Sequence, residues 1–289
     1  MLNNVAFIGL GTMGYPMAGH LSNKGYNVTT FNRTTSKAQA WVKEYNGAFA
    51  HTPAQCVDNA DIVFTCVGND QDLREVYCGE NGILASVKPN TLLVDHTTAS
   101  PQIARELDKL ARDKQCAFID APVSGGETGA INGLLTIMVG GDEAAFKQAE
   151  PVMQAYAKST ALMGSIGNGQ VTKMANQLCV AGVLQGLAEA ITLAQSAGLD
   201  IEKMVNVLKH GAAGSWQMEN RAVTMANDQF DFGFAIDWMR KDLAICFSEA
   251  DKLGVDLPLA RLVDSAYEDL QQQGENRSDT SVLIKQFKR

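Results

Sequence analysis

The chain has 289 residues, of which 46% are hydrophobic, and it carries a formal net charge of -8. This length is typical of about two globular domains, and the apolar content is sufficient for packed cores. Lysine and arginine do not cluster in the sequence, which excludes a nucleic-acid partner but not a small anion bound at a local basic site.

Cysteine spacing and apolar segments restrict the class of protein further. The six cysteines form no CxxC pair and have no histidines at metal-ligand spacing, so we expect reduced core thiols and no metal site. No basic and apolar leader precedes the first apolar run, and no apolar run reaches the ~20 residues of a membrane span. We therefore expect a cytoplasmic protein with no membrane partner.

The first part of the chain alternates short apolar runs with helical patterns. The runs predicted to form strands are 5–8, 27–31, 61–67, 91–95, 116–120, 135–139 and 159–163. Alternation at this spacing predicts βαβ units and a doubly wound, mostly parallel sheet that is covered on both faces.

After about residue 165 the strand signal disappears and the pattern becomes helical. The predicted helices are 168–196, 201–209, 216–227, 235–253, 258–273 and 279–287. The sequence therefore predicts an α/β domain over residues 1–164 and an all-α domain over residues 165–289, which begins with a long interdomain helix.

A glycine-rich turn directly follows the first predicted strand and opens the first predicted helix. It reads Gly9, Leu10, Gly11, Thr12, Met13, Gly14. In this context the first glycine permits a tight turn, the second lets a pyrophosphate approach the backbone, and the third lets helix and strand pack closely. The turn predicts a Rossmann-like domain that binds a dinucleotide.

The end of the second predicted strand bears on which dinucleotide is bound. NAD-binding domains often have an acidic residue here, which accepts hydrogen bonds from the ribose 2′-hydroxyl. This chain has Asn32, Arg33 and Thr34 instead. Asparagine lacks the charge that would repel a 2′-phosphate, and Arg33 with the Thr34 hydroxyl could bind one. We predict NADP in preference to NAD; NAD is the alternative if Arg33 is only a solvated loop residue.

A serine, two glycines and a lysine lie farther along the chain. Ser124, Gly125 and Gly126 follow the strand predicted at 116–120, and such a turn exposes backbone N–H groups that can bind a carboxylate, although it could also be merely flexible. Lys173 lies near the start of the interdomain helix, and no charged side chain follows it before Glu189. At 100° per residue it shares the apolar stripe of that helix, so it should point toward protein.

Together these stretches resemble four motifs of the β-hydroxyacid dehydrogenase family, which includes 3-hydroxyisobutyrate dehydrogenase and tartronate, succinic and glyoxylic semialdehyde reductases. VAFIGLGTMGYPMAGHL resembles the cofactor motif, DAPVSGG the substrate motif, GNGQVTKMANQ the catalytic motif and RKDL a later cofactor-side motif. The resemblance spans nearly the whole chain. It implies an oxidoreductase of a small anionic 3-hydroxy acid or its semialdehyde, in a homodimer or homotetramer paired through the helical domains.

The resemblance also assigns substrate-side roles by matching positions. Lys173 corresponds to the catalytic lysine, Ser124, Gly125 and Gly126 to the groups that bind the substrate carboxylate, and Asn176 to an amide that orients the substrate. Hydride transfer to an aldehyde leaves negative charge on oxygen, so a proton donor must lie within hydrogen-bond reach. Burial of a lysine disfavours its charged form, which brings its pKa toward the working pH.

Cofactor-side roles follow in the same way. Thr98 corresponds to a threonine at the nicotinamide, and Val67 and Gly68 to the strand end that lines the cofactor. Many members have a proline after the aliphatic residue, so the chain departs from the pattern there. Lys241 corresponds to a lysine at the nicotinamide end of the site, with Asp242 expected to support it.

Several alternatives remain open from the sequence. His96, at the end of a predicted strand, is a rival acid/base, and Trp216, which follows two glycines, either walls a pocket or makes a helix contact. The protein could instead be an NAD-dependent 3-hydroxyisobutyrate or L-serine dehydrogenase. An imine reductase-like enzyme and a cofactor-binding protein without turnover are further alternatives, and the retained Lys173 disfavours both.

Overall fold

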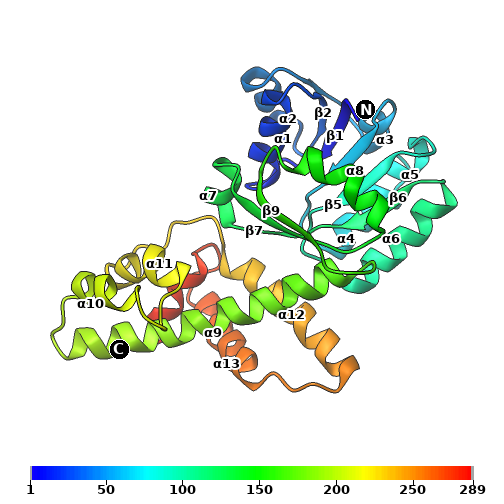
Figure 1. The fold of residues 1–289 in the computed structure, drawn as a ribbon. Coiled ribbons are helices and arrows are strands. Elements are labelled where there is room, and N and C mark those ends of the chain that lie inside the picture. Colours follow the sequence, from blue (N-terminus) through cyan, green and yellow to red (C-terminus); the bar gives the residue numbers. More distant parts are fainter. Residues whose placement is uncertain (1, 288–289) are drawn as a thin grey trace. The chain divides into compact units, whose positions relative to one another are not determined.

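A computed structural model of the protein describes residues 2–287, which Figure 1 shows coloured along the sequence. The backbone forms two compact units. The first ends at Lys173, and the second begins at Met174. The long helix α9 (Asn168–Ser196) contains this division near its start.

Within residues 2–287, the first unit is built on a six-stranded parallel sheet with the order β3-β2-β1-β4-β5-β6. Its strands are β1 (Asn4–Ile8), β2 (Asn27–Phe31), β3 (Ala48–Phe49), β4 (Ile62–Thr65), β5 (Leu92–Asp95) and β6 (Ala117–Asp120). All of them end at one edge. The order reverses between β1 and β4, where open α/β sheets bind ligands. The predicted doubly wound fold is confirmed.

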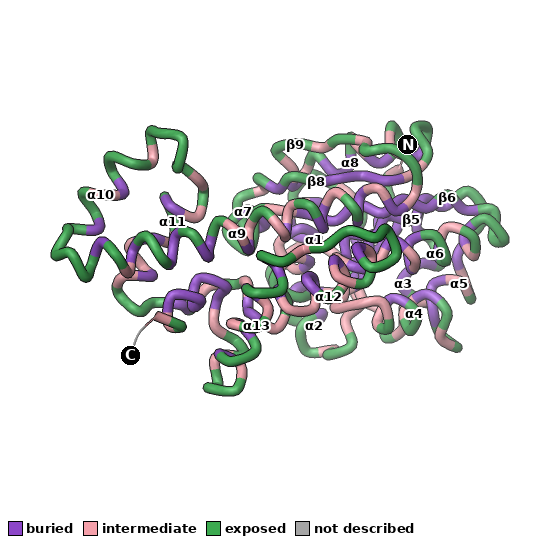
Figure 2. Tube along the Cα trace, turned by 90° about the horizontal axis from the view of Figure 1, so that it is seen from below, coloured by how far each residue is buried: buried purple, intermediate pink, exposed green. Residues whose placement is uncertain are grey.

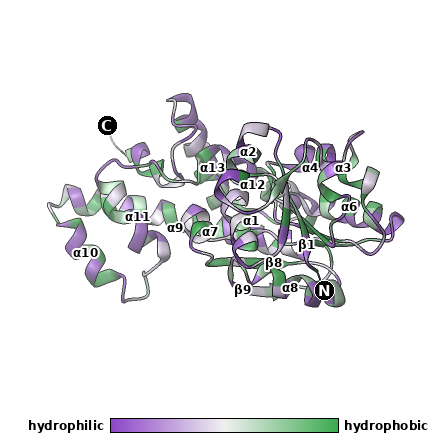
Figure 3. Ribbon diagram, turned by 90° about the horizontal axis from the view of Figure 1, so that it is seen from above, coloured by the Kyte–Doolittle hydropathy of each residue, from purple (hydrophilic) through white to green (hydrophobic). Residues whose placement is uncertain are grey.

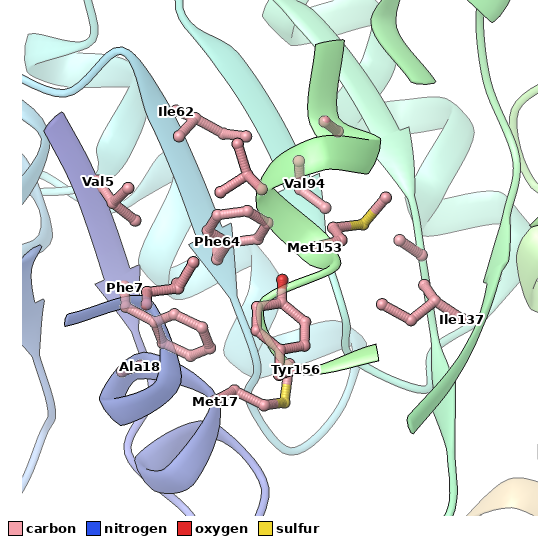
Figure 4. Packing of buried hydrophobic residues seen from close by; sticks show 14 of the residues in the cluster. Val5, Phe7, Met17, Ala18, Ile62, Phe64, Val94, Ile137, Met153 and Tyr156 are labelled. Atoms are coloured by element: carbon pink, nitrogen blue, oxygen red, sulfur yellow. The ribbon is translucent and has the colours of Figure 1, made fainter. Parts of the chain in front are cut away.

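Helices cover both faces of this sheet because its strands are apolar on both sides. Those on one face are α1 (Gly14–Asn23), α2 (Thr35–Glu44) and α8 (Glu143–Met153). Figure 4 shows part of this layer, with Phe7 and Phe64 of the sheet beside Met17, Met153 and Tyr156. Those on the other face are α3 (Pro53–Val57), α4 (Asp70–Cys78), α5 (Ile83–Ser86) and α6 (Pro101–Asp113). The strands are accordingly mostly buried in Figure 2 and hydrophobic in Figure 3.

A smaller sheet follows β6 in the described part of the chain. Its strands are β7 (Val123–Ser124), β8 (Leu135–Val139) and β9 (Ala157–Leu162), with helix α7 (Gly126–Ile131) between the first two. Strand β7 pairs antiparallel with β8, and β8 pairs parallel with β9. The sequence did not predict β3 or β7, because two-residue strands carry no recognisable alternation of apolar and polar residues.

The second unit is helical. Besides most of α9 it contains α10 (Ile201–Leu208), α11 (Trp216–Ala226), α12 (Ile236–Leu253), α13 (Pro258–Gln272) and η1 (Thr280–Phe287). Its core includes Leu184 and Ile191 of α9, Met239 and Leu243 of α12, and Tyr267 of α13. The last predicted helix, 279–287, is a 3₁₀ helix rather than an α-helix. At its start the Val282 N–H donates to the carbonyl oxygen of Asp279, three residues earlier.

Helix α9 corrects the expectation about apolar segments. With 29 residues, it is long and apolar enough to cross a membrane by length and composition alone. A core helix of a globular protein passes the same test. Leu184, Ala188 and Ile191 of α9 are in fact buried in the helical core. The helix therefore gives only weak support for a membrane location.

The cysteines also differ in part from expectation. All six are free thiols; Cys56, Cys116 and Cys246 are buried as expected, whereas Cys78 and Cys179 are exposed. Burial raises the pKa of the Cys246 thiol to about 12, so this thiol is protonated at neutral pH.

Candidate active site

The glycine-rich turn after β1 has one position that is open to a ligand. A Cβ on Gly9 would overlap the Cys66 carbonyl oxygen, and a Cβ on Gly14 would overlap the Gly9 carbonyl oxygen, so neither position tolerates a side chain. A Cβ on Gly11 would meet no described atom within 4 Å. Met13, at the N-cap of α1, provides no side-chain hydrogen bond to the helix terminus. An anion could therefore bind the N–H groups there.

The residues after β2 include Asn32, which hydrogen-bonds the backbone of two neighbouring segments, and the exposed cation Arg33. The Asn32 side chain accepts a hydrogen bond from the Leu10 N–H (2.9 Å) and donates one to the Thr34 carbonyl oxygen (3.1 Å). The Arg33 side chain is 79% exposed and lies 3.4 Å from Asp72 Oδ1. The sequence indicated a role for Asn32 only through its lack of charge, and it gave no sign of Asp72. Only the fold brings Asp72, 39 residues away, to Arg33.

The segments after β4 and β5 are tied together through Asp95. Its Oδ1 accepts hydrogen bonds from the Thr65 hydroxyl (2.7 Å) and the Thr97 N–H (3.1 Å), and the Thr97 hydroxyl accepts one from the Val67 N–H (3.0 Å). Its Oδ2 is buried and has no hydrogen-bond partner within residues 2–287. Burial raises the pKa of Asp95 to about 7. These bonds fix the segment that continues into Thr98, which is partly exposed.

The first turn of α9 is bonded to the ends of β5 and β6. Asp120 Oδ1 accepts a hydrogen bond from the Gly167 N–H (2.7 Å), and its Oδ2 accepts one from the Gln170 N–H (2.8 Å). The Gln170 side chain donates to the Thr97 carbonyl oxygen (2.7 Å) and accepts from the Ala99 N–H (3.0 Å). Lys173, three residues farther along, is only 8% exposed. The predicted inward orientation of this lysine fits that burial.

The Ser124-Gly125-Gly126 turn joins β7 to α7. Gly125 has φ +134° and Gly126 has φ +62°, values that strongly favour glycine. A Cβ on Gly126 would meet no described atom within 4 Å, and Ser124 is partly exposed. The turn therefore leaves open space beside the backbone at Gly126.

Three of the assigned residues belong to the second unit. Asn176 donates a hydrogen bond to the Gln177 side chain (2.8 Å), which in turn donates to Asp242 Oδ2 (2.6 Å). Lys241 Nζ lies 3.0 Å from Asp242 Oδ1. Gln177 was not assigned a role from the sequence. Its position could have indicated one, because it is a polar residue on the apolar stripe of α9. Trp216, at the start of α11, is 51% exposed.

His96 has a structural role. Its Nδ1–H donates to the Ala121 carbonyl oxygen (2.6 Å), Nε2 lies 2.8 Å from the Tyr156 hydroxyl, and the ring stacks on Phe64. Burial lowers the pKa of His96 to about 4. Because both nitrogens are occupied inside the core, the alternative of His96 as the acid/base is disfavoured.

Comparison with known proteins identifies the family. The family described as the NAD-binding domain of 6-phosphogluconate dehydrogenase matches residues 4–166. The family described as NAD-binding of NADP-dependent 3-hydroxyisobutyrate dehydrogenase matches residues 167–287. The chain belongs to the β-hydroxyacid dehydrogenase family. It is an NAD(P)-dependent hydroxyacid dehydrogenase of the 3-hydroxyisobutyrate dehydrogenase type.

Relatives match this hydroxyacid dehydrogenase along its length. An uncharacterized oxidoreductase of Shewanella frigidimarina is 55% identical over 280 residues, covering 97% of this chain and 96% of the relative. The NAD-dependent L-serine dehydrogenase of Pseudomonas aeruginosa is 33% identical and covers 99% and 98%. The solved structure of Mycobacterium tuberculosis 3-hydroxyisobutyrate dehydrogenase with L-serine is 30% identical, with a TM-score of 0.90 and complete coverage of both chains.

A dinucleotide fits the residues that this hydroxyacid dehydrogenase places at the carboxyl edge of its sheet. Gly11 leaves space for a phosphate at the N-terminus of α1, and the segments after β2, β4 and β5 lie at the same edge. The assigned residues of the first unit in these segments are Gly9, Leu10, Gly11, Thr12, Met13, Gly14, Asn32, Arg33, Thr34, Val67, Gly68 and Thr98.

Proposed function

We propose that this dehydrogenase transfers hydride between NADP(H) and a small 3-hydroxy acid or its semialdehyde, with Lys173 as the general acid/base. The anchoring of α9 is the observation that most supports this role. Asp120 and Gln170 bond the first turn of α9 to the ends of β5 and β6. Lys173 follows in the next turn, so it lies one turn from the edge of the sheet at which β1 and the glycine-rich turn also meet.

The chemistry requires a proton donor at the carbonyl oxygen. A bound reduced nicotinamide supplies the hydride. In reduction, the Lys173 ammonium donates a proton to the oxygen that becomes negative; in oxidation, the neutral amine accepts the alcohol proton. Lys173 is only 8% exposed, so little of its side chain is in contact with bulk water.

The Ser124-Gly125-Gly126 turn is proposed to bind the substrate carboxylate. Exposed backbone N–H groups and the Ser124 hydroxyl are suitable donors for an anion. The names of the relatives support the substrate class, since L-serine and 3-hydroxyisobutyrate both carry a hydroxyl on the carbon β to a carboxylate. Fixing the carboxylate sets the distance from the hydroxyl carbon to the hydride donor. Asn176 and Trp216 are proposed as further substrate contacts.

NADP preference is proposed from the end of β2. The amide of Asn32 is used by Leu10 and Thr34, and Arg33 is exposed enough to bind a 2′-phosphate beside the Thr34 hydroxyl. The nicotinamide half is assigned to Val67, Gly68, Thr98 and Lys241. We also propose a homodimer or homotetramer, on the basis of the family resemblance, and a cytoplasmic location, on the basis of the sequence pattern alone. Reduction of the semialdehyde is the direction that NADP(H) would favour.

Replacement of the lysine tests the mechanism. In Lys173→Ala we expect kcat to fall by about 10³-fold, because general acid–base catalysis contributes roughly 10²–10⁴-fold. The cofactor Kd should change little. Lys158→Ala, which removes an exposed lysine from β9, is the matched control. Near-normal kcat in Lys173→Ala would contradict the proposal.

A substrate panel separates the alternatives. Succinic semialdehyde, glyoxylate, tartronate semialdehyde, 3-hydroxyisobutyrate and L-serine should each be assayed with both cofactors. A higher kcat/KM for NADPH with one 3-carbon or 4-carbon acid is the expected result. A clear NADH preference would overturn the cofactor assignment, and binding without turnover of any substrate would favour a non-catalytic protein.

A further inference from the structure

Three distant segments of sequence meet at the Asp120 carboxylate. Asp120 ends β6, Gly140 follows β8, and Gly167 to Gln170 lead into α9. The backbone groups of Asp120 and Gly140 exchange two hydrogen bonds, with N···O distances of 3.0 and 2.7 Å. The side chain of Asp120 accepts the N–H groups of Gly167 and Gln170 and is completely buried. Both carboxylate oxygens are therefore bonded to backbone.

Close packing at this junction leaves no room for a shift. A Cβ on Gly169 would lie 2.5 Å from the Met138 carbonyl oxygen and 2.7 Å from that of Asp120. A Cβ on Gly140 would lie 2.5 Å from Asp120 Oδ1 and 2.7 Å from the Gly169 nitrogen. The first turn of α9 thus lies directly against the ends of β6 and β8.

Gln170 connects the same turn to the segment after β5. Its amide spans the Thr97 carbonyl oxygen and the Ala99 N–H, on either side of Thr98. Gln170 and Thr97 are each 1% exposed. The segment that carries Thr98 is therefore bonded directly to the first turn of the helix that carries Lys173.

We propose that Asp120 and Gln170 are positioning residues, which fix the first turn of α9 and thereby the Lys173 amine relative to the segments that carry Thr98 and Ser124. This inference rests on the proposed catalytic role of Lys173. Asp120 belongs to the stretch DAPVSGG, which resembles a substrate motif, but its oxygens are already bonded to the Gly167 and Gln170 N–H groups. It acts on the helix rather than on the substrate.

The physical reason is the unpaired backbone of a helix start. The first four N–H groups of an α-helix have no partner within the helix, and the N-terminal dipole favours a negative charge. Asp120 accepts the otherwise unpaired N–H of Gln170, although the two residues are 50 positions apart in the sequence. Asp120 therefore sets where the helix begins. Small displacements of a proton donor are costly, since about 1 Å can reduce turnover by about 10²-fold.

Asp120→Asn and Gln170→Met test the inference in the full-length enzyme. Asparagine keeps the shape but offers one acceptor instead of two, and methionine keeps the length of glutamine without its hydrogen bonds. In each we expect kcat to fall by about 10- to 100-fold, while KM for the acid and Kd for NADPH stay within about 3-fold. Activity is normalised to the concentration of cofactor-binding sites, so that unfolded protein does not count. A loss of folded protein alone would then leave kcat unchanged, whereas a displaced lysine lowers kcat without raising KM.

The control is Asp142→Asn. Asp142 also accepts backbone N–H groups at a helix start, that of α8, but it has no bond to α9. Asparagine is as good an N-cap residue as aspartate, so this variant should fold normally and keep its kcat per cofactor site. If Asp120→Asn does not fold, Gln170→Met carries the test.

The outcomes distinguish this inference from the proposed function. Unchanged kcat in both variants, together with an inactive Lys173→Ala, would overturn the positioning role alone. A raised KM at normal kcat in Asp120→Asn would assign Asp120 to substrate binding and also overturn it. Normal activity in Lys173→Ala would instead refute the proposed function.

Discussion

At the start of α9, Asp120 and Gln170 are buried and bonded to backbone; at the end of β2, Arg33 is 79% exposed and has one ion pair at 3.4 Å. The first arrangement is costly to disturb, because a buried polar group that loses its partner keeps its desolvation penalty. The second contributes little stability, because solvent screens an exposed pair. Changes at the helix start should therefore affect stability and turnover, and changes at Arg33 should affect cofactor choice.

Among the buried groups near the start of α9, Asp95 should have the largest effect on the free energy of unfolding. It pairs in register with Asp120 on the neighbouring strand, but its Oδ2 has no hydrogen-bond partner within residues 2–287. With the pKa of Asp95 raised from 3.8 to about 7, the folded state keeps a proton that the unfolded chain has lost. The stability from this proton is present at low pH and is lost as pH rises from about 4 to 7.

Asp95→Asn removes this titration. The difference in the free energy of unfolding between the variant and the wild type should shift in favour of the variant as pH rises from 4 to 8. The shift should reach up to about 4 kcal/mol, since each pKa unit corresponds to about 1.4 kcal/mol. Urea unfolding at both pH values measures the difference. Parallel pH profiles for the two proteins would show that Asp95 does not titrate in this window.

Gly169→Ala tests the close packing at the start of α9. The new methyl group would meet the carbonyl oxygens of Met138 and Asp120, so we expect a loss of about 3 kcal/mol in the free energy of unfolding. Gly186→Ala on the same helix is the control. Apart from its chain neighbours and its own helix backbone, no described atom would lie within 4 Å of a Cβ at Gly186, and alanine should stabilise the helix by up to about 1 kcal/mol. Equal effects of the two changes would contradict the packing argument.

Asp72→Asn examines the exposed end, where the expected effect is smallest. The change removes a negative charge beside Arg33 but retains an acceptor for the Gly68 N–H, which now donates to Asp72 Oδ2. The ratio of kcat/KM for NADPH over NADH should rise about 3- to 10-fold, because the screening of surface charges limits the gain. Arg33→Ser should lower it. Glu75→Gln, an equal charge change at an exposed position of α4, should leave it unchanged.

The sequence predicted those features that depend on local pattern. Apolar runs marked the long strands, and the spacing of Gly9, Gly11 and Gly14 marked the turn whose packing the structure explains. Contacts between distant positions carry no such pattern. The bonds from Asp120 to Gln170, from Arg33 to Asp72 and from His96 to Tyr156 join residues 50, 39 and 60 positions apart. Folding alone brings these pairs together.

The junction at Asp120 has a consequence for recombining members of the family. The two family descriptions divide the chain between residues 166 and 167, which suggests a crossover at that point. A chimera made there would take Asp120 and Gly140 from one parent and Gly167, Gly169 and Gln170 from the other. The crossover therefore divides the bonded junction at Asp120. Only parents that have the same residues on both sides of this junction should yield an active hybrid. A crossover beyond Lys173 takes all residues of this junction from one parent.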